Sequence, residues 1–153
     1  MSAVAGGGVA TLFVAIVANG LLAGMFFTFA VAISPGLRRV DDEVFVGTVR
    51  SVNRVILRPA FLMVFAAAPV SAVVATVLAG GEPLTLAGAI AALVSFAVTA
   101  LGNVPRNRDL DRAGAQPAGL VRARYERPWN RANVVRTIAS VLALLLLTAA
   151  AVR

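Results

Sequence analysis

The side chains that could form a binding site are asparagines, one tryptophan and one arginine, set among apolar segments. Asn103 and Asn107 flank Pro105, and this spacing predicts a locally broken helix end whose freed backbone groups point into a polar pocket. Irregular backbone at membrane depth is tolerated where it is buried in protein or lines a cavity. We therefore expect a polar pocket near the inner leaflet at this point of the chain.

A second group of polar residues has helical spacing. Trp129, Asn133 and Arg136 recur at i, i+4 and i+7 and so share one helix face, while Asn130 lies one position off it. A buried guanidinium needs hydrogen-bond acceptors, which asparagine side chains and broken-helix carbonyls supply. One hydrogen-bonded cluster is predicted to contain Asn103, Asn107, Asn133 and Arg136.

Two more asparagines, Asn19 in the first apolar run and Asn53 between the first two runs, are candidate binding residues. Structural roles are the alternatives for several of these residues. An intramembrane asparagine such as Asn19 often joins helices by hydrogen bonds of about 1 kcal/mol. Trp129 could be an interfacial anchor, and Arg136 could reach out to lipid headgroups.

Several kinds of chemistry lack their usual residues. The chain has no Cys and no His, so it has no thiol nucleophile, no thiolate metal site and no histidine base or haem ligand. All seven acidic residues lie outside the apolar runs. A carboxylate-rich di-iron centre, which needs Glu inside the helices, is excluded. We predict no metal and no cofactor.

The elements that carry these residues are membrane spans. All fourteen basic residues are arginines, and all but Arg153 fall within 38–58 or 106–136. Arginine collects in cytoplasmic loops because charge is costly in hydrocarbon. We predict four spans in one membrane domain, 1–153. This domain lies in the cell inner (plasma) membrane, and both termini are on its outer side. The spans cover about 9–33, 59–79, 84–104 and 133–152, and the cytoplasmic segments are 34–58 and 105–132.

The predicted fold is an all-α bundle of four transmembrane helices with an interfacial amphipathic helix between spans one and two. Phe45, Val49, Val52 and Ile56 recur at helical spacing in that segment, with Arg50, Arg54 and Arg58 opposite them. The net charge of +7 is explained by loop arginines that fix the topology and contact anionic lipid headgroups. No nucleic-acid partner is therefore expected. The Gly20-x-x-x-Gly24 spacing suggests close helix contact, within the chain or in a homo-oligomer.

Taken together and in order, these motifs resemble a known family. Asn103-Val-Pro-Arg-Asn107 is similar to its N-x-P-x-N signature, and Trp129-x-x-x-Asn133-x-x-Arg136 to its W-x-x-x-N-x-x-R signature. Asn19-Gly20 followed by Gly24-Met25-Phe26-Phe27, and a later helix with Asn53, also match. The family is the anthrone oxygenase-like group of small four-helix membrane proteins.

The resemblance implies oxidation of anthrones to anthraquinones by O₂ without a cofactor, as in fungal members. Such a reaction needs removal of an acidic C–H proton and stabilisation of the enolate. Arg136, Asn133 and Asn103 are the catalytic candidates that the resemblance suggests for the second task. For the first, the nearby residues are Tyr125, Glu126 and Asp109.

The leading hypothesis is therefore a membrane protein that binds a small aromatic or quinone-like molecule and acts as a cofactor-independent oxygenase. The predicted binding residues are Asn19, Asn53, Asn107, Trp129 and Asn130. A binding or transport module for a lipophilic compound is one alternative, although no span holds the acid that coupled export usually needs. A structural subunit that assembles through Gly20 and Gly24 is the other.

Overall fold

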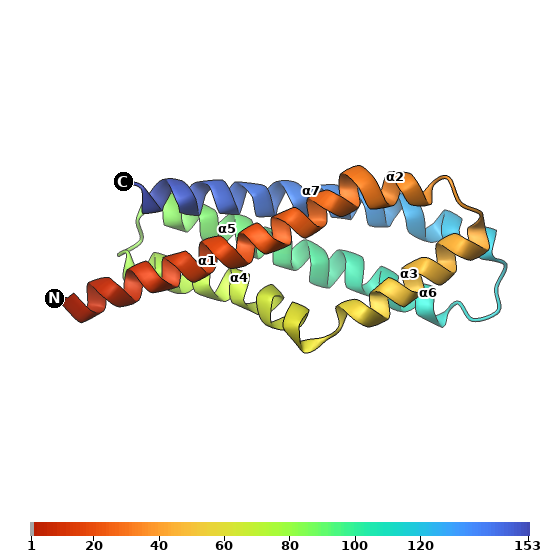
Figure 1. Cartoon of the computed structure of the whole chain (residues 1–153), viewed down its shortest axis with the longest axis horizontal. Helices are drawn as coiled ribbons and strands as arrows, with labels where there is room; N and C mark the ends of the chain where they lie inside the picture. The colour runs from red at the N-terminus through yellow and green to blue at the C-terminus, as the bar shows by residue number, and fades with distance from the viewer. Residues whose placement is uncertain (1) are drawn as a thin grey trace.

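Four long helices form an elongated bundle in the computed structural model, which describes residues 2–153 and the side chains from Gly7 onward (Figure 1). The prediction of an all-α bundle is confirmed. The elements follow one another as α1 (Ser2–Thr28), η1 (Phe29–Ile33), α2 (Ser34–Leu37), α3 (Asp42–Ile56), α4 (Pro59–Leu78), α5 (Pro83–Val98), η2 (Thr99–Asn103), α6 (Val104–Arg112) and α7 (Ala118–Ala151).

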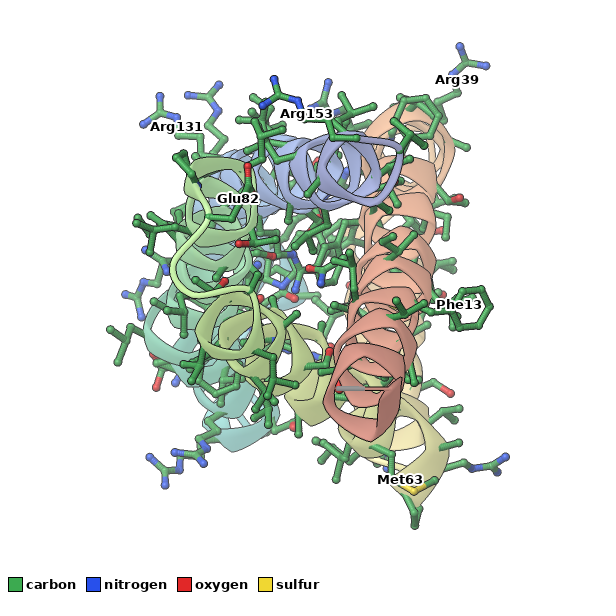
Figure 2. The ribbon with its side chains drawn as sticks, turned by 90° about the vertical axis from the view of Figure 1, so that its left-hand side faces the viewer. Phe13, Arg39, Met63, Glu82, Arg131 and Arg153 are labelled. Carbon is green, nitrogen blue, oxygen red and sulfur yellow. The ribbon has the colours of Figure 1, made fainter. Side chains whose placement is uncertain are left out.

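The four long helices are apolar enough to cross a membrane: 7–37, 59–78, 83–112 and 118–151 each contain a strongly apolar window. Their outward faces carry exposed apolar side chains, and Figure 2 shows Phe13 and Met63 pointing away from the bundle. A soluble protein seldom leaves so much apolar surface uncovered. The chain is a multi-pass membrane protein.

The bundle is closed by contacts between α1 and α4, α4 and α5, α5 and α7, and α7 and α1. Small residues fill its middle, where Ala15, Ala72, Ala89 and Ala143 are almost fully buried. Without large side chains between them, the helix backbones approach closely, as is typical of membrane bundles. Gly88 is an example, because a Cβ there would lie 2.8 Å from Cγ of Leu147.

Both chain ends and the turn between α4 and α5 lie at one end of the bundle, and α2, α3 and α6 lie at the other (Figure 1). The turn uses two glycines with positive φ, Gly80 at 65° and Gly81 at 81°. The amphipathic helix is confirmed as α3, and Asp41 caps it by accepting a hydrogen bond from Val44 N–H at 2.8 Å.

The apolar face of α3 packs against α6 and α7, and Phe45 and Val46 are buried there. The prediction placed Arg50 on the face opposite these apolar residues, with no partner in the chain. Instead, Arg50 reaches α6 and donates from Nε and Nη2 to the Leu110 carbonyl, at 3.1 and 2.9 Å. Its long side chain bridges two elements that the chain separates by 60 residues.

The chain remains helical beyond residue 33, where the first span was predicted to end, and through Pro105, where a locally broken helix end was predicted. The first helix passes through Pro35 to Leu37, and the third passes through Pro105 to Arg112. In each, a π-helical turn ends two residues before the proline, at Ile33 and at Asn103. A proline ring clashes with the carbonyl four residues earlier in an α-helix, and a wider turn displaces that carbonyl.

Candidate functional site

Arg136 lies at the centre of the candidate site, buried between two aromatic rings. Its guanidinium carbon is 4.0 Å from the centroid of Phe26 on α1 and 5.2 Å from that of Trp129 on α7. Only 5% of Arg136 is exposed, and Phe26 is fully buried. Arg136 therefore does not reach out to headgroups, which was the structural alternative.

Arg136 has a hydrogen-bond partner but no counter-ion. Its Nε donates to Asn133 Oδ1 at 3.0 Å, and Asn133 Nδ2 donates in turn to the Phe26 carbonyl at 3.2 Å. Among the described residues, no carboxylate forms an ion pair with Arg136, and its two terminal nitrogens make no hydrogen bond. A buried charge without an opposite charge is expensive, and intramembrane ionisable residues mark functional sites by default.

Asn107 links Tyr125 and Trp129, the two aromatic residues of the site that can donate hydrogen bonds. Its Oδ1 accepts hydrogen bonds from the Tyr125 hydroxyl and from Trp129 Nε1, each at 2.9 Å. Tyr125 and Trp129 lie one turn apart on α7, with ring centroids 6.0 Å apart. The single amide oxygen on α6 therefore fixes two rings on α7.

Asn103 lies at the end of η2 and is 1% exposed. Its Nδ2 donates to the Trp129 carbonyl at 3.3 Å, but its Oδ1 is buried and has no partner. Asn53, on α3, lies beside the Tyr125 side chain, yet its Nδ2 is also buried without a partner within hydrogen-bond limits. Buried polar atoms usually have partners, so an unpaired acceptor and an unpaired donor near these rings need an explanation.

The predicted cluster of four residues is present as two groups rather than one. Asn133 pairs with Arg136, whereas Asn103 and Asn107 bind Trp129. Among the described residues no hydrogen bond joins the two groups directly. They meet at Trp129, whose indole is held by Asn107 on one side and faces the guanidinium of Arg136 on the other.

Asn19 and Asn130 lie apart from this centre. Asn19 Nδ2 donates to the Ala15 carbonyl at 2.9 Å and to the Ala68 carbonyl at 3.2 Å, which links α1 to α4. It precedes Phe26 by two helical turns, about 10 Å along the axis. Asn130 is half-buried and lines a small cavity beside Trp129. Their roles in binding stay predictions.

That small cavity has a volume of about 20 Å³, enough for one water molecule. Four of its nine lining residues are aromatic, namely Phe29, Phe45, Tyr125 and Trp129. A larger cleft of about 370 Å³ opens on the far side of Tyr125. None of the cavities described is lined by Asn103, Asn133 or Arg136, so the pocket expected around these three residues is not among them.

Two residues of the site were not predicted from the sequence, and the hydrogen-bonding role of a third was not foreseen. Phe26 and Phe29 were not recognised as ring partners of Arg136 and Trp129. Tyr125 was predicted only as a candidate base, although its spacing of four residues from Trp129 placed it on the same helix face. In the part of the chain that the structure describes, no group of three His, Cys, Asp or Glu residues is placed to hold a metal ion.

Of the other two candidate bases, Glu126 lines the small cavity beside Trp129, whereas Asp109 lies farther out. Glu126 accepts from Arg122 Nε at 2.8 Å, and Asp109 lines the larger cleft. Arg122 also donates to the Leu37 and Val40 carbonyls, so it fastens the segment before α3 to α7. Glu126 is therefore committed to a structural ion pair, whereas Asp109 is open to the cleft.

Comparison with known proteins identifies the family. The family model for anthrone oxygenase matches residues 48–146, which include Asn53, both asparagines around Pro105 and the polar face of α7. No curated protein and no solved structure matches the chain. Since the match covers more than half of the chain and every polar residue of this centre, this protein belongs to the anthrone oxygenase family.

Proposed function

We propose that this protein is an oxygenase that holds an acidic aromatic ketone of the anthrone type beside Arg136 and lets O₂ react with its enolate without a cofactor. The observation that carries the proposal is the buried Arg136 guanidinium, which has two free terminal nitrogens and no carboxylate partner among the described residues. A ligand oxyanion would supply the missing negative charge. Such preorganised donors stabilise charge as it develops.

The reaction balances with O₂ as the only oxidant. Loss of a proton from the methylene carbon of the anthrone leaves an aromatic enolate, with negative charge on the ketone oxygen. O₂ forms a bond to that carbon and takes up the electron pair, and protonation gives a hydroperoxide. Loss of water from the hydroperoxide breaks the O–O bond and leaves a second carbonyl, so that anthrone and O₂ become anthraquinone and water.

The surrounding residues suit a flat, aromatic ligand. Phe26 and Trp129 present ring faces to the guanidinium, and Phe29 packs against Trp129. Aromatic rings stack favourably on one another. The unpaired Asn103 Oδ1 and Asn53 Nδ2 offer one acceptor and one donor to a hydroxylated ring. A three-ring ligand needs more space than the small cavity provides, so binding requires these rings to move apart.

For proton removal we favour a group on the Tyr125 side of Trp129, where Tyr125 and Asp109 both reach the cleft. Replacing each in turn, as Tyr125→Phe and Asp109→Asn, identifies the base. The variant that lacks the true base should show a large fall in kcat. The other variant should keep most of its turnover.

We propose that this multi-pass protein lies in the cell inner membrane. We propose that both termini face outward and that the end with α3 and α6 faces the cytoplasm. Two observations support this: both chain ends lie at one end of the bundle, and arginine is concentrated toward the other. Cytoplasmic segments are enriched in arginine.

Turnover of an anthrone by the purified protein tests the proposal, measured as O₂ uptake and anthraquinone formation above the uncatalysed rate. Arg136→Ala should lower kcat by about 10²–10³-fold, as expected for loss of an oxyanion donor. Arg136→Lys keeps the charge and should be intermediate, which guards against a simple folding failure. Arg131→Ala, an exposed arginine on the same helix, is the control.

Equal turnover in the protein and in Arg136→Ala would contradict the proposal. A protein that turns over no anthrone but co-purifies with an aromatic compound, detected by mass spectrometry of its extract, would instead be the binding module. Turnover should also survive chelators, since the proposed reaction uses no metal.

A further inference from the structure

The larger cleft, of about 370 Å³, lies at the end of the bundle that holds α3 and α6. It is formed by α6, the turn after it and the first turns of α7. Its floor is apolar and aromatic, with Leu110, Val121 and Tyr125, each about 95% buried or more. Its volume falls within the ~300–1,000 Å³ range of small-molecule sites.

The rim of this cleft is positively charged. Arg106, Arg112 and Arg124 line it, against a single acid, Asp109. The ion pairs in the described part of the chain are formed by other arginines, Arg38 and Arg122. The three cleft arginines therefore have no carboxylate partner there, although Arg106 also donates from Nη1 to the Gly102 carbonyl at 2.6 Å.

Tyr125 connects this cleft with the candidate site. Its side chain lines the cleft and also the small aromatic cavity on the other side. Beyond it lies Trp129, whose indole faces Arg136. A ligand whose charged group lies among the cleft arginines would therefore direct its rings at Tyr125 and toward the site.

We propose that the arginine-lined cleft binds the carboxylate group of the aromatic substrate, so that the substrates of this protein include ring systems bearing an acid. Arginine binds carboxylates through paired hydrogen bonds, and three arginines around one cleft supply more donors than a single carboxylate needs. The aromatic ring system in this inference rests on the proposed function. The carboxylate rests only on the arginines of the cleft. Asp109 opposes binding because it adds a like charge.

Binding of anthraquinone-2-carboxylate and of uncharged anthraquinone to the protein in nanodiscs of zwitterionic lipid tests the proposal. We expect the carboxylate to bind at least tenfold more tightly than the uncharged compound. The double variant Arg112→Ala/Arg124→Ala should remove this preference and leave the affinity for anthraquinone unchanged. Arg106 is retained because its bond to Gly102 supports the π-helical turn.

The control is Arg127→Ala/Arg131→Ala, which removes two exposed arginines that line a separate, more open cleft of about 880 Å³ on α7, and it should keep the preference. Asp109→Asn should tighten carboxylate binding several-fold, and a gain of affinity cannot arise from misfolding. Equal loss in both double variants would mean general charge attraction, and would overturn the proposal. So would an absent preference, or an unchanged affinity in Asp109→Asn.

A lipid headgroup is the other source of an oxyanion at this depth. Nanodiscs containing phosphatidylglycerol should weaken carboxylate binding only slightly if the cleft is built for the substrate. Loss of all preference in those nanodiscs would assign the cleft to anionic lipid and overturn the proposal. Failure of the proposed function is a separate result, since it would abolish anthrone turnover without altering the difference between the two probes.

Discussion

The guanidinium of Arg136 lies 4.0 Å from the centre of the Phe26 ring, so the fourth long helix places its only buried charge against a ring of the first. A desolvated cation–π pair is worth about 2 kcal/mol. The Phe26 carbonyl also accepts a hydrogen bond from Asn133, which is itself the hydrogen-bond partner of Arg136. Phe26 therefore contacts both Arg136 and Asn133.

Phe26→Leu keeps the apolar contact but removes the ring face. We expect a loss of about 1–2 kcal/mol in the free energy of unfolding. Denaturant unfolding in detergent measures it. Phe27→Leu, at the exposed neighbouring position, should cost far less. Equal effects of the two changes would show that the ring contributes only bulk.

Asn107→Leu removes the acceptor shared by Tyr125 and Trp129. Two buried donors then lose their partner, at a cost of about 1–3 kcal/mol each. Trp129 is the only tryptophan, so intrinsic fluorescence reports on it alone. In Asn107→Leu we expect the Trp129 emission maximum to shift and its fluorescence to be quenched more readily by a soluble quencher. The control is Gln116→Ala, at an exposed position in the turn before α7, which should show neither change. An unchanged spectrum in Asn107→Leu would contradict the assigned bond.

Gly88→Ala introduces a methyl group where Cγ and Cδ2 of Leu147 lie within 2.9 Å. Leu147 is fully buried, so α5 and α7 must move apart. Overpacking of this kind costs about 1–3 kcal/mol. A thermal melt of the purified protein checks it. Gly24→Ala, whose added methyl meets nothing within 4 Å, is the matched change and should leave the melting temperature nearly unchanged.

The absence of native cysteine makes the proposed orientation easy to test. We expect Ala79→Cys, in the turn after α4, to react with an impermeant maleimide in intact cells. Ala115→Cys, in the turn between α6 and α7, should react only after the cells are opened. Both positions are exposed. Labelling in the reverse order would invert the orientation.

Glu82 provides a pH-dependent contribution outside the spans. Its carboxylate accepts from Thr85 N–H at 2.8 Å and caps α5, and this bond is the main cause of a pKa below the ordinary value. Since the folded-state pKa is the lower one, the stabilisation is present above the ordinary glutamate pKa and is lost as the pH falls through the folded-state pKa. Glu82→Gln should melt earlier than the parent at neutral pH, and the difference should vanish in acid.

The fold could be predicted because membrane physics separates charge from apolar residues along the chain. The arginine distribution and four apolar runs are enough to predict four helices, and the acidic residues at 41–43 mark the start of α3. The path through Pro35 and Pro105 was predicted incorrectly. A proline indicates a break, but whether the chain ends there or widens into a π-helical turn depends on packing that distant segments supply.

The polar residues of the site could be found for the same reason, since each is costly in a membrane. Their partners could not. Phe26 and Phe45 resemble other apolar residues in sequence, and only the packing of α1 and α3 on α7 turns them into ring partners. The division of the expected cluster into two groups follows from the direction in which each asparagine points, which spacing along a helix leaves open.

The two π-helical turns have a consequence for how the chain tolerates changes in length. Each behaves like a one-residue insertion into an α-helix, and everything beyond it is turned by about 100° relative to an uninterrupted helix. Deletion of Ala100 within Thr99–Asn103 would remove that rotation and carry Asn107 off the face that meets α7. Around these turns the number of residues is under tight constraint, so a substitution of the exposed Leu101 should be accepted where its deletion is not.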